Sequence, residues 1–570
     1  MKKLLFVSIL AFALASCTKD NGGTDPNPGG EGTAQYLHVN FVSNVSGTKA
    51  TAGGYEDGTT NNESFVKEVR LYFFDNTGNP KFVTADNKSY KTIEGMDSTA
   101  QDMNNVEKIL GATVVIENIK KADDVPAYVV AILNPTDAIL QTNYKLSDLQ
   151  DVVAAVPLSA ESRGTNGFVM SNSVYYDGTD VAIATAISTD NYAATAEAAK
   201  AKPVTIHVER TVAKVSLNVS YSDKLAGHDN TFSTQQKDAN GNFIYVQFDG
   251  WTVTGVADNS YVIKKIEKDW GTTAPFANWN DASLYRSFWA ENPSSLTYSY
   301  TSYNTSKPVE GFLTAERSTT PNFTYVRENA AKDDSGEDAA TKTQVIIAGT
   351  LVDHEGNTLE IADYAGVKYY NAPGEAEKSL KTVFANLLDG KVYKIEQAGD
   401  NVSAEKLKPE DIKFRLATPE DTGSDKAESE TPGRYFVYAC LANDNPEGYD
   451  WSSSNEAGRP YDEDEDEALS VEDVNNLLKN QGHAKIWKSG MTYYYFDIEH
   501  FGSNGKGVNG VVRNHVYEAN ISNLSGLGTP VYEPGKTIWP EHTVEENIII
   551  AAEIRILSWR IVSQDVSLVW

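Results

Sequence analysis

Apolar and polar residues alternate along most of Val204-Thr-Ile-His-Val-Glu-Arg-Thr-Val-Ala-Lys-Val-Ser-Leu-Asn-Val219. Alternation with a period of two is typical of a β-strand that buries one face. An alanine-rich stretch at residues 193–201 ends just before this run, so we expect a domain boundary at residues 200–210. The run therefore predicts both a β-rich fold and the place where one domain follows another.

Further alternating runs lie on both sides, separated by clusters of Gly, Asn, Asp and Pro. They occupy residues 36–41, 69–74, 127–132, 344–348, 492–496 and 515–520. Many short strands joined by such turns favour β-sandwiches.

Helical signals are few. We expect helices at residues 147–156, 193–201 and 471–479, and Ser470 and Asp473 form a capping pattern at the start of the last one. Polar, poorly patterned stretches at residues 328–342 and 421–433 are expected to be insertions in the second half.

The composition disfavours several classes of protein. The 570 residues exceed one ordinary domain, and 40% hydrophobic with 22% charged residues suit a folded chain. The 49 Lys and Arg against 79 Asp and Glu give a net charge of -30. This acidity argues against nucleic acid or anionic lipid as a partner, because binding phosphates needs clustered basic residues. We interpret it as a means of keeping an exported β-protein soluble.

The N-terminus has the pattern of an export signal. Lys2 and Lys3 precede an uncharged apolar run at residues 4–14, which is shorter than the roughly 20 residues that span a bilayer. Leu-Ala-Ser followed by Cys17 resembles a bacterial lipobox, in which the thiol is lipidated; the alternative is a plain signal peptide with an incidental Cys. Residues 1–16 are then the signal peptide, and the Gly- and Pro-rich stretch after Cys17 is a flexible tether.

Cys17 and Cys440 are the two cysteines of the chain. If Cys17 is lipidated, Cys440 has no partner for a disulfide. Cys440 lies in a strand-like run, so we expect a small buried residue rather than a reactive thiol.

The sequence carries no positive sign of an active site, and we predict no metal and no cofactor. The acidic run at residues 462–467 lacks the Gly and Glu that an EF-hand needs at its sixth and twelfth positions. His354-Glu355 begins like a zinc-protease motif, but the second His is missing. Gly535-Lys536-Thr537 ends like a phosphate-binding loop, yet Pro530 stands where the first Gly is required.

Near the N-terminus, Leu37, Val39 and Phe41 alternate with polar residues, which predicts a strand with one buried face. A stretch of small residues follows at 46–54, and Lys49 is its one basic residue. Such a stretch should be exposed and easily cleaved, and a trypsin-like protease would cut between Lys49 and Ala50.

The C-terminus alternates again. The apolar positions, with Trp559 between the two blocks, are Ile548, Ile550, Ala552, Ile554, Ile556, Val562, Val566, Leu568 and Trp570. One interpretation is that this tail is the last strand of its own sheet. The other is that it leaves its own domain and enters a sheet of a neighbouring molecule. Removal of the strand at residues 36–45 would open a groove for it.

Several pieces of the chain, in order, resemble the fimbrillins of the Bacteroidales type V pili. They are Cys17, Lys49-Ala50, residues 55–58, 69–75, 127–135, 168–172, 208–215, 248–251, 490–495, 512–521 and 523–528, and the tail with Trp559.

The resemblance implies two β-sandwich domains of transthyretin-like topology, at residues 50–205 and 206–544, and a C-terminal donor strand at 545–570. It implies a precursor exported as a lipoprotein to the outer membrane, from which a protease removes residues 17–49. A strand from an adjacent subunit then fills the groove, so the partners are copies of the chain and related subunits. One departure is Lys49, because the usual junction has Arg there. Without cleavage the protein would resemble the anchoring subunits, which keep their lipid.

Two other functions stay open at the level of sequence. A tip or anchor adhesin could bind host or bacterial surface ligands, with glycans stacking on the Tyr- and Trp-rich second domain. A surface glycoside hydrolase is the third hypothesis, since 79 acidic residues supply many carboxylate pairs by chance.

Overall fold

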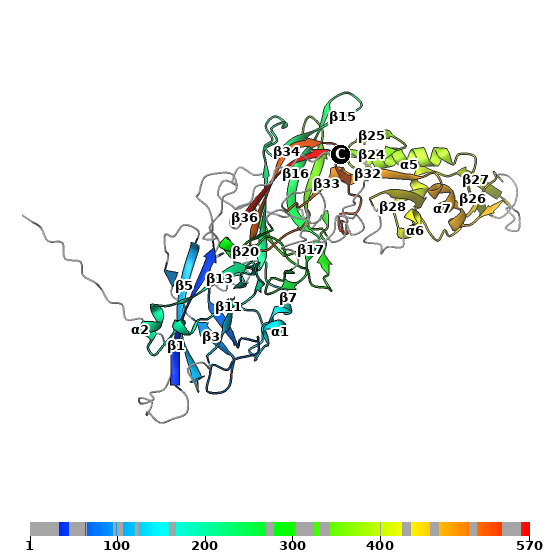
Figure 1. Cartoon of the computed structure of the whole chain (residues 1–570). Coiled ribbons are helices and arrows are strands. Elements are labelled where there is room, and N and C mark those ends of the chain that lie inside the picture. The colour runs from blue at the N-terminus through cyan, green and yellow to red at the C-terminus, as the bar shows by residue number, and fades with distance from the viewer. Residues whose placement is uncertain are drawn as a thin grey trace, which may run out of the picture.

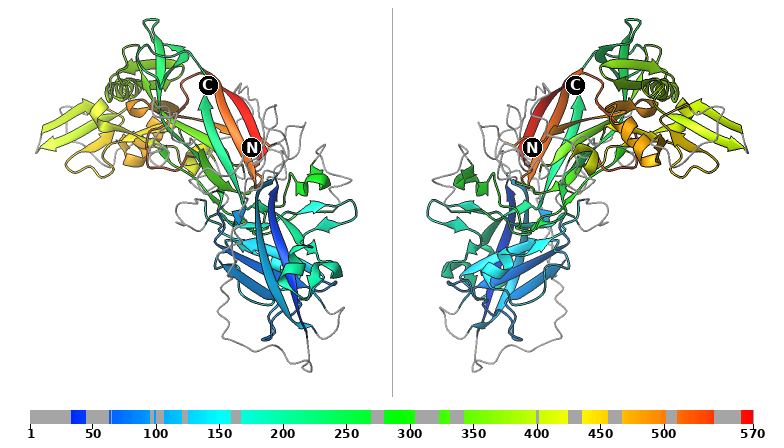
Figure 2. Two further views of the ribbon diagram at one scale, coloured as in Figure 1. Left: turned by 90° about the vertical axis from the view of Figure 1, so that its left-hand side faces the viewer. Right: turned by 90° about the vertical axis from the view of Figure 1, so that its right-hand side faces the viewer.

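The structure is a computed structural model in which the chain forms three folded bodies that lie at an angle to one another (Figure 1). The N-terminal strands form one body, the C-terminal strands form a second, and an α/β unit projects from the second (Figure 2). The described residues are 33–44, 63, 65–94, 98–99, 106–119, 125–158, 167–268, 279–303, 323–330, 342–398, 401–423, 435–455, 467–500, 510–538 and 560–569.

A ten-stranded sheet forms the N-terminal body. Its main path runs β3-β2-β6-β8-β13-β1-β5-β4, with β11 paired to β6 and β12 to β1. The strands are β1 (Thr33–Asn44), β2 (Glu68–Phe74), β3 (Tyr90–Glu94), β4 (Ser98–Thr99), β5 (Val106–Ile119), β6 (Tyr128–Leu133), β8 (Met170–Asn172), β11 (Thr185–Ala186), β12 (Tyr192–Ala193) and β13 (Val204–Arg210).

Short β8 joins the two halves of this sheet, because it pairs with β6 on one side and β13 on the other. Alternate side chains of β2 and β6 then meet those of β1, β5 and β13 in one cluster, the N-terminal core. Its buried members are Leu37, Val39, Phe41, Val69, Leu71, Phe73, Val83, Leu110, Ala112, Val114, Ile116, Ile119, Val129, Ala131, Leu133, Met170, Ile187, Val204, Ile206 and Val208.

A β-sandwich of two sheets forms the C-terminal body. One sheet has the order β22-β14-β34-β36 and the other β15-β16-β23-β33-β35. The strands are β14 (Val212–Val219), β15 (Thr231–Lys237), β16 (Phe243–Thr254), β22 (Phe323–Arg327), β23 (Gln344–Val352), β33 (Met491–Asp497), β34 (His515–Ser525), β35 (Thr529–Pro530) and β36 (Arg560–Val569).

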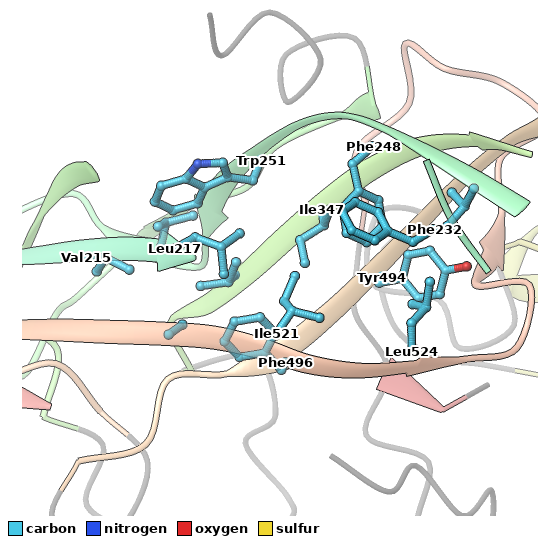
Figure 3. Packing of buried hydrophobic residues seen from close by; sticks show 14 of the residues in the cluster. Val215, Leu217, Phe232, Phe248, Trp251, Ile347, Tyr494, Phe496, Ile521 and Leu524 are labelled. Carbon is cyan, nitrogen blue, oxygen red and sulfur yellow. The ribbon is translucent and has the colours of Figure 1, made fainter. Parts of the chain in front are cut away.

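The inward side chains of the two sheets interlock around Trp251, Phe248 and Phe496 (Figure 3). We call this cluster the sandwich core. The chain passes from the N-terminal sheet to this sandwich at Thr211, between β13 and β14.

A third, inserted unit lies between β23 and β33, which pair directly with each other in the sandwich. Its elements are β24 (Glu360–Tyr364), β25 (Val367–Asn371), α5 (Glu375–Leu387), β26 (Tyr393–Ala398), β27 (Asn401–Lys406), β28 (Ile412–Leu416), α6 (Pro419–Thr422), β29 (Val437–Leu441), β30 (Asp450–Ser452), β31 (Ala468–Leu469), α7 (Val471–Lys479) and β32 (His483–Trp487). Helices α5 and α7 and the sheet β25-β24-β32-β29-β28 share a core of their own around Leu380, Phe384 and Leu478.

Short elements complete the described chain. They are α1 (Leu146–Gln150), β7 (Val153–Ala154), β9 (Tyr175–Tyr176), β10 (Val181–Ala182), α2 (Ala196–Lys200), β17 (Val256–Ala257), β18 (Ser260–Tyr261), β19 (Asn280–Asp281), β20 (Arg286–Ser287), β21 (Tyr298–Ser299) and the 3-10 turns η2 (Thr189–Asn191), η3 (Ala282–Leu284), η6 (Pro409–Asp411) and η8 (Lys488–Gly490).

The same five-residue turn, Asp-x-x-Gly-Asn, occurs after β2, after β15 and after β23. In each, the Asp carboxylate accepts hydrogen bonds from the backbone N–H groups two and four residues later. The Gly has φ of 80°, 87° or 88°, which only Gly adopts at low cost. The turns begin at Asp75, Asp238 and Asp353, so His354-Glu355 belongs to a turn and not to a metal-binding helix.

The prediction of a mostly β fold is confirmed, and the strands expected within the described residues are present. Ser470 and Asp473 form the expected capping box of α7. Two expected helices are shorter than predicted: α1 ends at Gln150, and α2 starts at Ala196. Cys440 is buried in β29, as expected. The sequence analysis did not predict α5, whereas the helix that it predicted at residues 471–479 is α7 of the inserted unit.

Candidate strand-exchange site

β1 lies inside the N-terminal sheet, with a hydrogen-bonded neighbour on each side. It runs parallel to β13, with Val39 opposite Val204, and antiparallel to β5, with Phe41 opposite Leu110. Removing β1 would therefore leave a slot between two strands rather than shorten an edge.

The three residues predicted for the displaced strand have the burial that this position requires. Leu37 and Val39 are 0% exposed and Phe41 is 1% exposed, and all three belong to the N-terminal core. The opposite face of β1 is polar. There the Nδ1 atom of His38 lies 2.8 Å from the Thr113 hydroxyl. Burial, followed by the charge of Lys200, lowers the pKa of His38 below its ordinary value.

Both ends of the segment that carries the expected cleavage point are fixed at one place, the end of β13. Upstream, Ser43 of β1 lies opposite Val208. Downstream, the backbone carbonyl of Glu63 accepts a hydrogen bond of 3.0 Å from Nε of Arg210. The predicted cleavage residues Lys49 and Ala50 lie between these two points, outside the described residues.

Glu63 is fully buried and ties the N-terminal body to the sandwich. Its carboxylate lies 3.1 Å from Nζ of Lys214 on β14, and the hydroxyl of Tyr325 on β22 donates to it. Arg210 also reaches Asn514 at 3.4 Å. A buried carboxylate needs such partners, because an ion without them in a low-dielectric interior is costly.

Two further buried ion pairs lie at the same junction. Lys264 Nζ is 2.9 Å from Glu209, and Arg513 is 2.8 Å from Glu328. Burial lowers the pKa of Lys264, and the carboxylate of Glu209 opposes this effect. The side chains of Lys264 and Arg513 are both 0% exposed. The junction is therefore held by charge pairs as well as by apolar packing.

The tail is a parallel strand of the sandwich. β36 pairs with β34 from Arg560 opposite His515 to Val569 opposite Ser525, and it stands at the edge of its sheet. Val562, Val566 and Leu568 lie on β36. The other predicted donor positions, Ile548, Ile550, Ala552, Ile554, Ile556, Trp559 and Trp570, lie outside the described residues. The lipidation residue Cys17 does so too.

The two bodies share one pairing rule. In each, the first strand runs parallel to a strand from late in the same body: β1 beside β13, and β14 beside β34. Sequence alternation could not show this, because it indicates which face of a strand is buried and not which strands are neighbours. It also missed the buried charges at the junction, since charged residues in an alternating run are ordinarily solvent-facing.

No group of three or more His, Cys, Asp or Glu side chains in the described residues could hold a metal ion. None of the helices in this part of the chain has the length and apolarity to span a membrane.

In the structure β1 is thus an internal strand of its sheet, and β36 is an edge strand of the sandwich. Residues 485–565 match a family model described as major fimbrial subunit protein type IV, fimbrillin, C-terminal. The predicted resemblance to the fimbrillins is thus confirmed, and this region, from β32 into β36, carries it.

Comparison with curated proteins finds no match. Among solved structures, a fimbrilin from Porphyromonas gingivalis W83 has 12% sequence identity and a TM-score of 0.32. The match covers 93% of this chain and 97% of the fimbrilin chain. A protein from Parabacteroides distasonis described as a putative cell adhesion protein has 20% sequence identity and a TM-score of 0.28, and the match covers 55% of this chain and 75% of that protein. The tip fimbrial protein Mfa3 from P. gingivalis has 10% identity and a TM-score of 0.25, with 65% and 98% covered. At these TM-scores the likenesses do not establish a shared overall fold.

Proposed function

We propose that the protein is a structural subunit of a cell-surface fimbria and that it polymerises by strand exchange after β1 is removed. The observation that carries this proposal is the position of β1 between β13 and β5, with its three apolar side chains in the N-terminal core. The fimbrillin match at residues 485–565 supports the same class of function.

Cleavage between Lys49 and Ala50 would leave β1 bound without a covalent link to the rest of the body. Three buried side chains, each worth about 1.5–3 kcal/mol, and two ladders of backbone hydrogen bonds would still retain it. An incoming strand of the same alternation would replace both kinds of interaction at once. The free energy of the exchange is therefore close to zero. A longer incoming strand favours the exchange, because it makes more backbone hydrogen bonds than β1.

The incoming strand is, in this proposal, the tail at residues 545–570 of another copy. Within one chain, β36 is an edge strand paired only on its β34 side among the described residues. Leaving that edge costs one ladder of hydrogen bonds, whereas the slot between β13 and β5 offers two. The precursor is held at the outer membrane by lipid on Cys17 until the cut releases it.

The N-terminal residue of protein purified from cells gives the first test. Ala50 is expected for a polymerising shaft subunit, whereas lipidated Cys17 would identify an anchor. A Lys49→Ala variant should stay monomeric after protease treatment, and Lys88→Ala, at an exposed Lys of the same body, should polymerise normally.

The tail gives the second test. Protease-treated protein that ends at Val544 should not polymerise alone, yet it should accept a tail from intact subunits and cap the fibre. Equal fibre growth with and without residues 545–570, measured by electron microscopy, would contradict the proposal.

A further inference from the structure

A groove of about 680 Å³ lies on the N-terminal body, on the face of the sheet opposite to the N-terminal core. Its floor includes Thr205 and His207 of β13, whose neighbours Val204, Ile206 and Val208 point into that core. Its volume falls within the roughly 300–1,000 Å³ of sites that bind small molecules. The strand-exchange proposal does not use this groove.

One wall of the groove is a hairpin, β19 and β20, with the turn η3 at its tip. The side-chain amide of Asn280 donates to the Tyr176 carbonyl at 2.9 Å and accepts from the Tyr176 N–H at 2.8 Å. Ser287 donates to the Val174 carbonyl at 2.8 Å. Both strands of the hairpin are thus fixed, one to β9 and the other to the residue before it, and the wall is formed before any ligand arrives.

Tyr285 stands at the tip of this hairpin in a strained conformation. Its backbone has φ 54° and ψ 45°, in the left-handed region that a bulky residue rarely adopts. Its ring stacks on the imidazole of His207, with centroids 3.7 Å apart and planes 8° apart, and Tyr175 meets it edge-on at 5.6 Å. The side chain nevertheless remains 39% exposed at the groove. Such strain is tolerated where the position of a side chain is needed.

The polar groups around Tyr285 favour an uncharged ligand. Oδ1 of Asp177 already accepts from the N–H groups of Thr179 and Asp180, at 2.7 and 2.8 Å. Asp180 lies 3.5 Å from Nζ of Lys268. Backbone N–H groups and Lys268 thus already interact with these carboxylates, which would repel an anionic ligand.

The floor supplies hydrogen-bonding groups without a net charge. The hydroxyl-bearing side chain of Thr205 is exposed there. Nδ1 of His207 is buried and has no hydrogen-bond partner among the described residues. Burial lowers the pKa of His207 to about 4, so its ring, stacked under Tyr285, is neutral near pH 7 and adds no charge to the floor.

We propose that this groove binds an uncharged pyranose sugar, whose C–H face stacks on Tyr285 and whose hydroxyl groups bond to the floor. A pyranose presents one apolar face and a rim of hydroxyls, and a Tyr ring combines an apolar body with a polar tip in the same way. The hairpin fixes the stacking surface, and β13 fixes the polar floor.

The test uses the full chain and four probes: the methyl glycosides of glucose, galactose, mannose and N-acetylglucosamine. Saturation-transfer NMR should show transfer to the ring protons of at least one of them. Tyr285→Gly should weaken that binding at least about tenfold, because the stacking surface is lost. It should keep the fold, since Gly adopts the φ of this position without strain.

Ala365→Gly is the matched control, because Ala365 also has a positive φ, 50°, but lies on the inserted unit away from the groove. It should leave sugar binding unchanged. The proposal is overturned if none of the four glycosides binds, or if Tyr285→Gly, folded by circular dichroism, binds them as the parent chain does. Preferential binding of an oligolysine peptide in the same groove would also overturn it.

Discussion

The carboxylate of Glu63 lies 3.1 Å from the ammonium group of Lys214, and the two side chains are 0% and 6% exposed. Glu63 precedes the second strand of the N-terminal sheet, whereas Lys214 is on the first strand of the sandwich. The pair therefore joins the two bodies directly beside the segment in which cleavage is expected. After a cut at Lys49, Glu63 would hold the new N-terminal segment at the junction and away from the slot.

Glu63→Gln should destabilise the chain by about 3–5 kcal/mol, because it leaves the buried ammonium of Lys214 without its counter-charge. Urea unfolding followed by Trp fluorescence measures the loss. Asp86→Asn removes a fully exposed carboxylate near Lys88, and no measurable change is expected there. A Glu63→Gln chain as stable as the parent would show that the pair does not hold the junction.

The variant Phe41→Ala tests whether β1 stays in the sheet permanently or is replaced during polymerisation. In the precursor it should cost about 3–5 kcal/mol, since it opens a cavity in the N-terminal core. In cleaved and polymerised protein it should cost nothing, because β1 has left. Phe73→Ala, in the same core but on β2, should destabilise both forms. Thermal unfolding of the two forms gives the comparison, and a loss of stability in both for Phe41→Ala would contradict the exchange of β1.

The strands could be predicted from the sequence because alternation reports directly on a half-buried strand. The junction charges could not, and the reason lies in β13 and β14. Glu209 and Lys214 occupy positions that alternation assigns to solvent. The fold places other parts of the chain against those positions, and such long-range packing leaves no local signal. The sequence predicted the buried face of β1, but only the structure shows that β13 and β5 lie on either side of it.

Acid should weaken the fold between pH 6.5 and about 4 in part through His207. Its pKa is about 4 in the folded chain and 6.5 in the unfolded chain, so in this window the unfolded state binds the extra proton. Stability is therefore full above pH 6.5 and falls as the pH is lowered towards 4. His38, His483 and His515 have lowered pKa values too and add to the slope.

His207→Phe keeps a ring against Tyr285 but cannot titrate. Thermal unfolding at several pH values should show a shallower acid slope for this variant than for the parent. Tyr285→Gly should also reduce the slope, because it uncovers the imidazole. An unchanged slope in His207→Phe would mean that this residue is as accessible to protons in the folded chain as in the unfolded one.

Within the inserted unit, helix α7 was predicted from the sequence, but helix α5 was not. Helix α5 does carry an apolar stripe, with Ala376, Leu380 and Phe384 four residues apart and all buried. Its N-cap is Gly374, which lacks the side-chain oxygen of a strong start signal. Strands precede and follow it closely. A helix in such a context is easily taken for a loop between strands.

Excising this unit should leave the sandwich intact. Strands β24 and β32 pair with Asp363 opposite Lys485, so replacing residues 365–483 by Asn-Gly closes them as a two-residue hairpin. The shortened chain should retain Ile361 and Trp487 in the sandwich core, and with them the hydrogen bond of 3.1 Å from the Trp487 indole to Gly528.

The excised chain is expected to be soluble, to show the near-ultraviolet circular dichroism of packed aromatic residues, and to polymerise after cleavage. Phe384→Ala in the full chain provides the companion measurement. It should lower the stability of the inserted unit by about 3–5 kcal/mol and leave the unfolding of the sandwich unchanged. If removing the unit also unfolds the sandwich, the two cores form one cooperative body, and the insertion is then part of the subunit's structural frame.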